Sequence, residues 1–146
     1  MRLATVGDLQ AVEAIVREAY TPYVARMGRM PGPMLDDYRA SITAGRVHVI
    51  EHGGAVRGVL VLIPEVETML LDNIAVDPAA QGAGLGRRML GFAEETARAS
   101  GFRAIRLYTN EAMTENVGLY SRLGWVETHR GEENGFRRVY FAKQLG

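Results

Sequence analysis

The sequence predicts an α/β domain with a mixed central sheet of about six to seven strands and helices on both faces. Strand-like and helix-like segments alternate in the order β, α, α, three β, α, β, α, two β. One helix connects two strands as a crossover, which makes those strands parallel neighbours. The 146 residues are enough for a single domain, 1–146, with a full core.

The composition excludes several classes of protein. Hydrophobic residues make up 47% and charged residues 23%, as in ordinary soluble domains. The net charge of zero predicts no nucleic-acid partner. The chain has no cysteine, which excludes disulfides and thiol chemistry, and His48, His52 and His129 lack metal-ligand spacing, so we expect no metal. Without a membrane-length apolar run or a signal-peptide core, we expect a soluble cytoplasmic protein with no membrane partner.

The N-terminal region predicts a short strand over residues 1–5 and then a helix. Thr5 and Asp8 form a helix-start pattern, with the threonine as cap and the acid in the first turn. An apolar stripe at helical spacing continues to about Tyr20. Three prolines and two glycines within residues 21–35 predict an irregular connection.

A second short helix is expected from Asp36 to Ala44. Two strands follow at Val47–Ile50 and Val56–Ile63. Gly53-Gly54 between them favours a tight hairpin turn, because glycine readily adopts positive φ angles. These strands should therefore pair antiparallel.

The apolar run Met69–Val76 predicts a buried strand, which ends because Pro78 has no N–H for a sheet hydrogen bond. A helix-favouring segment runs on to Ser100. Between them lies a loop with three glycines, Gly82, Gly84 and Gly86. A glycine-rich turn that leads into a helix exposes unpaired N–H groups at the positive end of the helix dipole. The sequence therefore predicts an anion site here.

The remaining segments complete the sheet. Ala104–Thr109 predicts a strand parallel to Met69–Val76, because a helix connects the two. A helix is expected over Thr114–Leu123. Two final strands, Trp125–Arg130 and Phe136–Ala142, flank a glycine-containing connection and should form an antiparallel hairpin.

The identity of the anion follows from two motifs. The glycine spacing is not that of a dinucleotide-binding fingerprint, and no Gly-Lys-Ser/Thr of a P-loop is present. Gln81–Gly86 instead has the form Gln/Arg-x-x-Gly-x-Gly/Ala, which resembles the pyrophosphate loop of the GCN5-related N-acetyltransferases (GNAT). Asn116–Trp125, which reads Asn-Val-Gly-Leu-Tyr-Ser-Arg-Leu-Gly-Trp, resembles a second motif of this family. The resemblance implies the GNAT fold.

The resemblance also implies a reaction, in which acetyl passes from acetyl-CoA to a primary amine by direct attack in a ternary complex. The amine would belong to a small molecule, an amino acid or a peptide. The alternative is a non-catalytic acyl-CoA-binding or sensor module on the same fold. Family members often form homodimers, so a dimer is possible here. The residues that the resemblance assigns to acetyl-CoA are Ile74, Val76, Gln81, Gly82, Ala83, Gly84, Leu85, Gly86, Arg87, Asn116 and Tyr120.

Two residues are candidates for proton transfer. Tyr120 falls on the family's general-acid position, and its hydroxyl is suited to protonating a thiolate as the C–S bond breaks. The alternative is that Tyr120 is a core aromatic. Asp72 is the candidate base, acting directly or through a water molecule, with Glu65 and Glu67 as weaker rivals.

The acceptor cleft of this family is usually walled by the first two helices. Here that region offers aromatic, methionine and arginine side chains, of which the candidates for the acceptor are Tyr23, Arg26, Met27 and Met34. Aromatic and methionine walls suit an amine with an apolar body. Arginine suits an acceptor carboxylate. Equally, these residues could simply pack the first helices or form a dimer contact.

Overall fold

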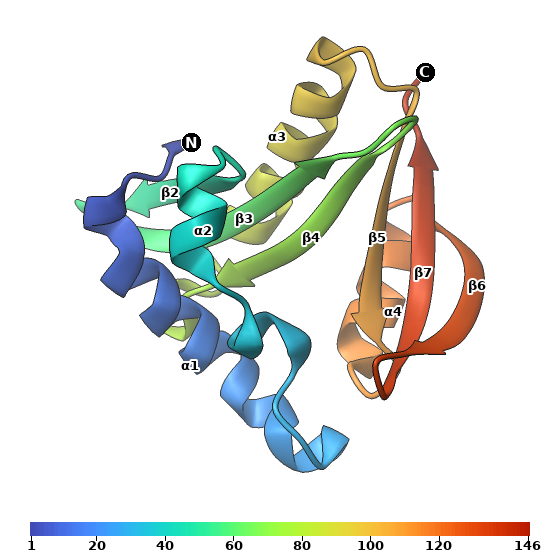
Figure 1. The fold of residues 1–146 in the computed structure, drawn as a ribbon, viewed down its shortest axis with the longest axis horizontal. Helices are drawn as coiled ribbons and strands as arrows, with labels where there is room; N and C mark the ends of the chain where they lie inside the picture. The colour runs from blue at the N-terminus through green and yellow to red at the C-terminus, as the bar shows by residue number, and fades with distance from the viewer.

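The computed structural model describes residues 1–146 and folds the chain around one seven-stranded sheet (Figure 1). Its strand order is β1-β2-β3-β4-β5-β7-β6. The strands are β1 Arg2–Leu3, β2 Val47–His52, β3 Ala55–Pro64, β4 Met69–Val76, β5 Ala104–Asn110, β6 Val126–Glu133 and β7 Phe136–Gln144. Only β4 and β5 pair in parallel. The prediction of a mixed sheet with one parallel pair is confirmed.

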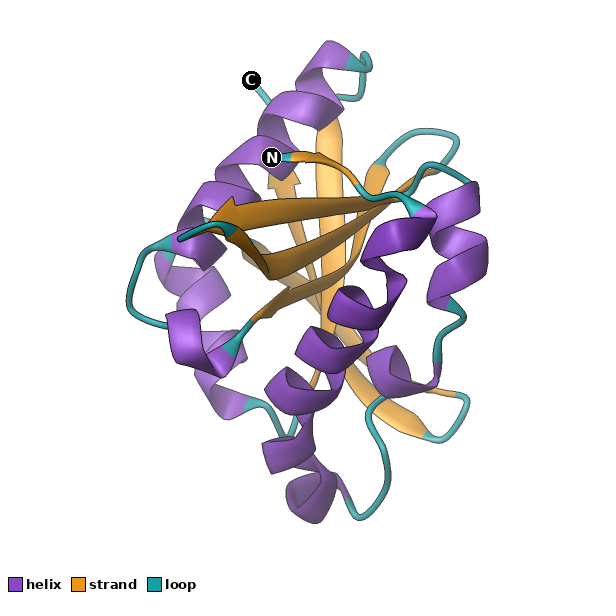
Figure 2. Cartoon of the chain, turned by 90° about the vertical axis from the view of Figure 1, so that its left-hand side faces the viewer, coloured by secondary structure: helices purple, strands orange, loops and turns teal.

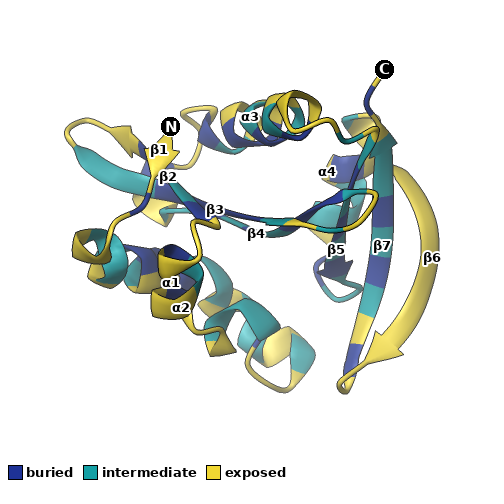
Figure 3. Cartoon of the chain, turned by 45° about the horizontal axis from the view of Figure 1, so that its top comes forward, coloured by how far each residue is buried: buried dark blue, intermediate teal, exposed yellow.

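Helices cover both faces of the sheet, as predicted (Figures 2 and 3). They are α1 Leu9–Met27, α2 Tyr38–Thr43, α3 Leu85–Ala99 and α4 Thr114–Arg122, with short 3-10 turns at Val6–Asp8, Gly32–Leu35 and Pro78–Ala80. Strand β3 supplies Val59 and Val61 to the core under α1 and α2, and Leu60 and Leu62 to the core under α3 and α4. None of the four helices has both the length and the apolar character needed to cross a membrane.

Several local predictions are confirmed. The carboxylate of Asp8 accepts a hydrogen bond from the N–H of Thr5 at 2.8 Å, where the first helix was expected to start. Gly53 and Gly54, at φ 64° and 83°, form the turn between β2 and β3. Helix α3 ends just before Gly101, which has a φ of 86°.

Helix α1 is longer than predicted. It was expected to end near Tyr20, but it continues through Pro22 to Met27. Pro22 removes one backbone donor, and the hydroxyl of Thr21 bonds to the carbonyl of Arg17 one turn earlier. Gly28, at φ 70°, ends the helix. This extra length brings Arg26 to Glu115 at the start of α4 and Met27 to the lining of the site described below.

The C-terminal hairpin also differs from the prediction. The segment Gly131–Gly135 was expected to be the connection, but β6 continues to Glu133 and only Asn134-Gly135 form the turn, at φ 54° and 81°. Asparagine and glycine are the residues that tolerate these angles best. Strand β7 lies between β5 and β6 (Figure 1), and its Val139 and Phe141 belong to the core that packs under α3 and α4.

Strands β4 and β5 separate partway along their length, which opens the sheet. They pair only at Met69–Leu71 with Ile105–Leu107. The separation begins at Asp72, an extra residue between the pairs Leu62–Leu71 and Val61–Asn73 of β3 and β4. Such a bulge bends a strand away from its neighbour. Beyond it, the β5-facing edge of β4 is free, and Figure 1 shows the two strands diverging.

Gly58 allows α3 to lie close to β3, and replacing it tests this packing. A Cβ at Gly58 would lie 2.6 Å from Ile50 Cγ2 and 2.9 Å from Met89 Cε. We expect Gly58→Ala to lower the free energy of unfolding by about 1–3 kcal/mol through overpacking. Gly91→Ala on α3 is the control, because a Cβ there meets open space and should stabilise the helix by up to about 1 kcal/mol. Urea unfolding measures both, and a Gly58→Ala variant as stable as wild type would contradict this packing argument.

Candidate functional site

A groove runs from the glycine-rich loop to helix α4. The structure brings together on it every residue predicted to bind acetyl-CoA except Ala83: Ile74, Val76, Gln81, Gly82, Gly84, Leu85, Gly86, Arg87, Asn116 and Tyr120. Ala83 belongs to the same loop, but its side chain is exposed and outside the groove. The lining is mainly apolar, with the charged Arg87 at the loop end.

The loop presents unpaired backbone donors. Gly82 and Gly84 have φ angles of 89° and 77°, and nothing lies within 4 Å of where their Cβ atoms would be. The first backbone hydrogen bond of α3 runs from the N–H of Arg88 to the carbonyl of Gly84. The N–H groups of Leu85, Gly86 and Arg87 therefore have no partner in the protein. This arrangement suits a diphosphate at the positive end of the helix dipole.

The free edge of β4 continues the groove inward. Ile74 and Val76 lie beyond the last pairing of β4 with β5, so this segment has no strand partner on its β5 side, although the Ile74 carbonyl accepts a hydrogen bond from the Tyr20 hydroxyl at 3.1 Å. Such an edge can pair with the amides of an extended ligand, as a further strand would. Asn116 lies across the opening on α4, with its Nδ2 3.5 Å from Thr109 Oγ1. A pantetheine arm fits these donors and acceptors.

Tyr120 lies at the junction of this groove with a second pocket, and it lines both. Its ring packs against Trp125 and Phe141, with centroids 6.1 and 5.7 Å away. The residue is only 6% exposed, yet its hydroxyl forms no hydrogen bond within the protein. Burial raises the pKa of Tyr120 to about 12, so the phenol stays protonated at neutral pH. Tyr120 is thus a core aromatic whose protonated hydroxyl lies at the pocket wall.

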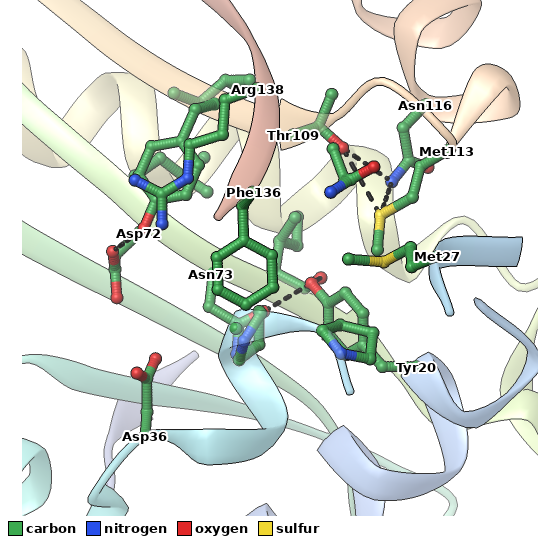
Figure 4. Close-up of a pocket in the computed structure, with 18 of the residues that line it drawn as sticks. Tyr20, Met27, Asp36, Asp72, Asn73, Thr109, Met113, Asn116, Phe136 and Arg138 are labelled. Carbon is green, nitrogen blue, oxygen red and sulfur yellow. Dashed lines mark hydrogen bonds between the residues drawn. The ribbon is translucent and has the colours of Figure 1, made fainter. Parts of the chain in front are cut away.

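The second pocket holds Asp72 (Figure 4). The hydroxyl of Tyr108 donates to Asp72 Oδ1 at 2.9 Å, across the point where β4 and β5 separate. Burial, followed by the charge of Asp72, raises the pKa of Tyr108. The hydrogen bond from Tyr108 therefore fixes the orientation of a carboxylate at the base of the opening.

A second carboxylate, Asp36, lines the same pocket and was not predicted as a site residue. Figure 4 shows Asp36 and Asp72 on the same side, away from Met27 and Asn116. Asp36 is exposed as a whole residue, but the pocket crowds its carboxyl group. This desolvation, with the negative charge of Asp72, raises the pKa of Asp36 to about 6, against a smaller opposite effect of Arg138.

This raised pKa predicts how stability depends on pH. The folded-state pKa of Asp36 is about 6, above the ~3.9 of an unfolded aspartate. The folded state therefore binds the proton more tightly, and the contribution of Asp36 to stability falls as pH rises from about 4 to about 6. We expect Asp36→Asn to remove this fall. Urea unfolding of both proteins across this pH range measures it, and parallel curves would contradict the assignment.

Arg138 of β7 is the only cation in the lining of this pocket. Its guanidinium lies over the ring of Tyr108, 4.1 Å from the centroid, and donates to Glu133 Oε2 at 2.9 Å. The Glu133 carboxylate also accepts from the hydroxyl of Tyr140 at 2.7 Å. Arg138 is therefore held by an acidic partner outside the pocket.

A buried polar network holds one wall of the pocket. The hydroxyl of Tyr20 is 2.6 Å from Asn73 Oδ1 and 3.1 Å from the carbonyl of Ile74. Asn73 Nδ2 donates to the hydroxyl of Tyr38 at 2.8 Å, and that hydroxyl donates to the carbonyl of Pro33 at 2.6 Å. These bonds tie α1 and the Gly32–Leu35 turn to β4, and they position the segment that carries Asp36.

The residues predicted for the acceptor are separated by the structure. Met27 lines the pocket with Asp72, whereas Tyr23 lies on the groove beside the loop. Arg26 was expected to suit an acceptor carboxylate, but it forms two hydrogen bonds with Glu115, at 2.8 and 2.7 Å, and lies outside the pocket. Met34 packs against the core under α1 and α2. For Arg26 and Met34 the packing alternative describes the structure better.

The rival bases are also outside the pocket. Glu65 forms two hydrogen bonds with Arg106, at 2.7 and 2.8 Å, and Glu67 lies in the turn before β4. Three residues that line the pocket, Tyr108, Asp36 and Arg138, were not predicted as site residues. Of these, Tyr108 could have been predicted from its position in the sequence. It lies near the carboxyl end of a predicted parallel strand, where ligands of open α/β sheets bind. No sequence pattern marked Asp36 or Arg138, because only the tertiary fold brings these two residues to the pocket.

Comparison with known proteins agrees with this geometry. The chain matches the model of the acetyltransferase (GNAT) family over residues 9–125. It is similar to an uncharacterized N-acetyltransferase, YjgM, of Escherichia coli (strain K12), with 28% identity over 86% of this chain and 80% of that protein. No group of three or more His, Cys, Asp and Glu side chains is arranged to hold a metal ion.

Solved structures share the fold. The ribosomal-protein-S18-alanine N-acetyltransferase from Escherichia coli has a TM-score of 0.75 at 19% identity, covering 97% of this chain and 90% of that one. YncA from Salmonella typhimurium, solved with its cofactor acetyl-CoA, has a TM-score of 0.72 at 21% identity, covering 99% and 92%. The similarity extends over nearly the whole of each chain.

Proposed function

The chain belongs to the acetyltransferase (GNAT) family, and from that premise we propose that it transfers acetyl from acetyl-CoA to a primary amine by direct attack. The position of Tyr120 carries this proposal. The residue is buried, but its hydroxyl is protonated, has no protein partner and is not among the fully buried polar atoms, and the residue lines both the groove and the Asp72 pocket. A proton donor is needed where the acetyl donor and the amine meet.

The chain's own residues fit the parts of acetyl-CoA. The N–H groups of Leu85, Gly86 and Arg87 would bind its diphosphate, and Asn116 with the free edge of β4 would bind the pantetheine amides. Acetyl-CoA supplies an activated thioester. A backbone N–H of β4 near Ile74 would stabilise the negative charge that develops on the carbonyl oxygen. Val76 and Gln81 complete the walls of the groove.

Two proton transfers complete the reaction. An amine must lose a proton before its nitrogen lone pair can attack the carbonyl carbon, and Asp72, or a water molecule that it orders, would accept that proton. As the C–S bond breaks, Tyr120 would give its proton to the departing thiolate. The hydrogen bond from Tyr108 would hold Asp72 ready for this role. The absence of cysteine argues against an acetyl-cysteine intermediate.

A panel of amines incubated with acetyl-CoA tests the proposal. Release of free CoA thiol, together with a product heavier by one acetyl group in mass spectrometry, is the expected result. The panel should contain small monoamines, diamines, amino acids and peptides. CoA binding without turnover on any of them would contradict the proposal and favour the sensor module.

A further inference from the structure

We propose that the acceptor is a dication of the diamine class, with its reacting amine at Asp72 and its second ammonium group at Asp36. This inference rests on the proposed acetyl transfer and names its substrate class. It follows from the distribution of charge in the pocket that holds both carboxylates. Figure 4 shows the two groups entering from different elements, Asp72 from β4 and Asp36 from the segment before α2.

The carboxylate of Asp36 has no ion-pair partner within the protein. It forms no hydrogen bond and no ion pair within the protein, although it lines the pocket and is close enough to Asp72 for the two negative charges to interact. Two nearby carboxylates repel each other, and Arg138 offsets only part of this repulsion at Asp36, so a bound cation would recover free energy. The network Tyr20–Asn73–Tyr38–Pro33 holds the segment that carries Asp36, so the carboxylate is kept at the pocket.

The arginine in the pocket lining does not neutralise the negative charge of the two aspartates. Arg138 already donates to Glu133 and stacks on Tyr108, so it does not form an ion pair with either aspartate. The lining then has two carboxylates against one arginine that has a partner elsewhere. This balance favours a ligand with positive charge at both ends over one that brings a carboxylate.

A second, independent observation also points to a ligand. Tyr120 is more than nine-tenths buried and lines this pocket, and its hydroxyl has no partner in the protein. Because this hydroxyl is not among the fully buried polar atoms, it is accessible from the pocket, where a bound molecule can form a hydrogen bond with it. The apolar part of the same lining includes Met27, Leu71, Leu107 and Phe136. An aliphatic chain between two amines suits such walls.

Three acceptors with the same four-carbon chain test the inference: 1,4-diaminobutane, butylamine and 4-aminobutanoate. We expect kcat/KM to be highest for the diamine. Asp36→Asn should raise KM for the diamine by about 10-fold or more with little change in kcat, because it removes a charged hydrogen-bond partner. The same variant should change KM for butylamine by less than about 2-fold. Glu132→Gln, an exposed acid on β6, is the control and should change neither.

Calorimetric titration of the CoA-bound protein with 1,4-diaminobutane separates this inference from the proposed reaction. Binding that weakens in Asp36→Asn supports the dication site even if no acetyl transfer occurs, and in that case only the reaction is refuted. Turnover of butylamine or 4-aminobutanoate that equals or exceeds that of the diamine overturns the inference and leaves acetyl transfer intact. An Asp36→Asn variant with unchanged diamine binding and KM also overturns it.

Discussion

Replacing Tyr120 with phenylalanine is expected to lower kcat for acetyl transfer by about 100-fold or more, the usual contribution of a positioned general acid. The affinity for CoA should stay within about 2-fold, because the hydroxyl makes no contact that the bound diphosphate needs. The fold should be unaffected, since the ring contacts with Trp125 and Phe141 remain and no hydrogen bond within the protein is lost. Steady-state kinetics and CoA titration measure the two effects.

Tyr140→Phe is the matched control for this experiment. Tyr140 is a half-buried tyrosine whose hydroxyl donates to Glu133, and it lines neither the groove nor the pocket. Its loss should leave kcat unchanged. If Tyr120→Phe turns over as fast as wild type, tyrosine has no part in the proton transfer.

Replacing Asp72 with asparagine should lower kcat/KM by about 100-fold at neutral pH, because asparagine cannot accept a proton from the attacking amine. Part of the activity should return at high pH, where more of the amine, with an unperturbed pKa near ~10.4, is already neutral. Asparagine keeps the shape of the side chain and can still accept the hydrogen bond from Tyr108. The pH dependence of kcat/KM for both proteins is the measurement.

Two variants separate the loss of the base in Asp72→Asn from the loss of a hydrogen bond and from the loss of a negative charge. Tyr108→Phe removes only the hydrogen bond that orients the carboxylate, so it should cost less than Asp72→Asn. Glu132→Gln again controls for the loss of one negative charge elsewhere on the surface. A pH profile of Asp72→Asn that is parallel to that of wild type would show that another group removes the proton.

The sequence predicted which residues line the groove beside the glycine-rich loop, because the parts of this groove are encoded locally. The strand Met69–Val76 ends at the predicted residues, and the glycines of the loop adopt the expected conformations next to the start of α3. Asn116 and Tyr120 are four residues apart, so one turn of α4 brings both to the same opening. Each of these features depends on backbone preferences within a few residues.

The lining of the pocket that holds Asp72 was harder to predict, because distant segments form it. Arg138 reaches it only because β7 lies between β5 and β6, an order that the local pattern does not specify. Asp36 depends on the turn before α2, which a network of buried hydroxyl groups holds in place. Arg26 was assigned to the acceptor because an arginine can pair with a carboxylate, but α1 extends past Pro22 and brings Arg26 to Glu115.

The central claim is that one continuous groove leads a diphosphate-anchored thioester from the loop to Tyr120. A crystal structure of the protein with CoA tests it most directly. The predicted result has the diphosphate oxygens within hydrogen-bond distance of the N–H groups of Leu85, Gly86 and Arg87, and the sulfur beside the Tyr120 hydroxyl. Phosphates bound elsewhere, or a sulfur far from Tyr120, would contradict the account.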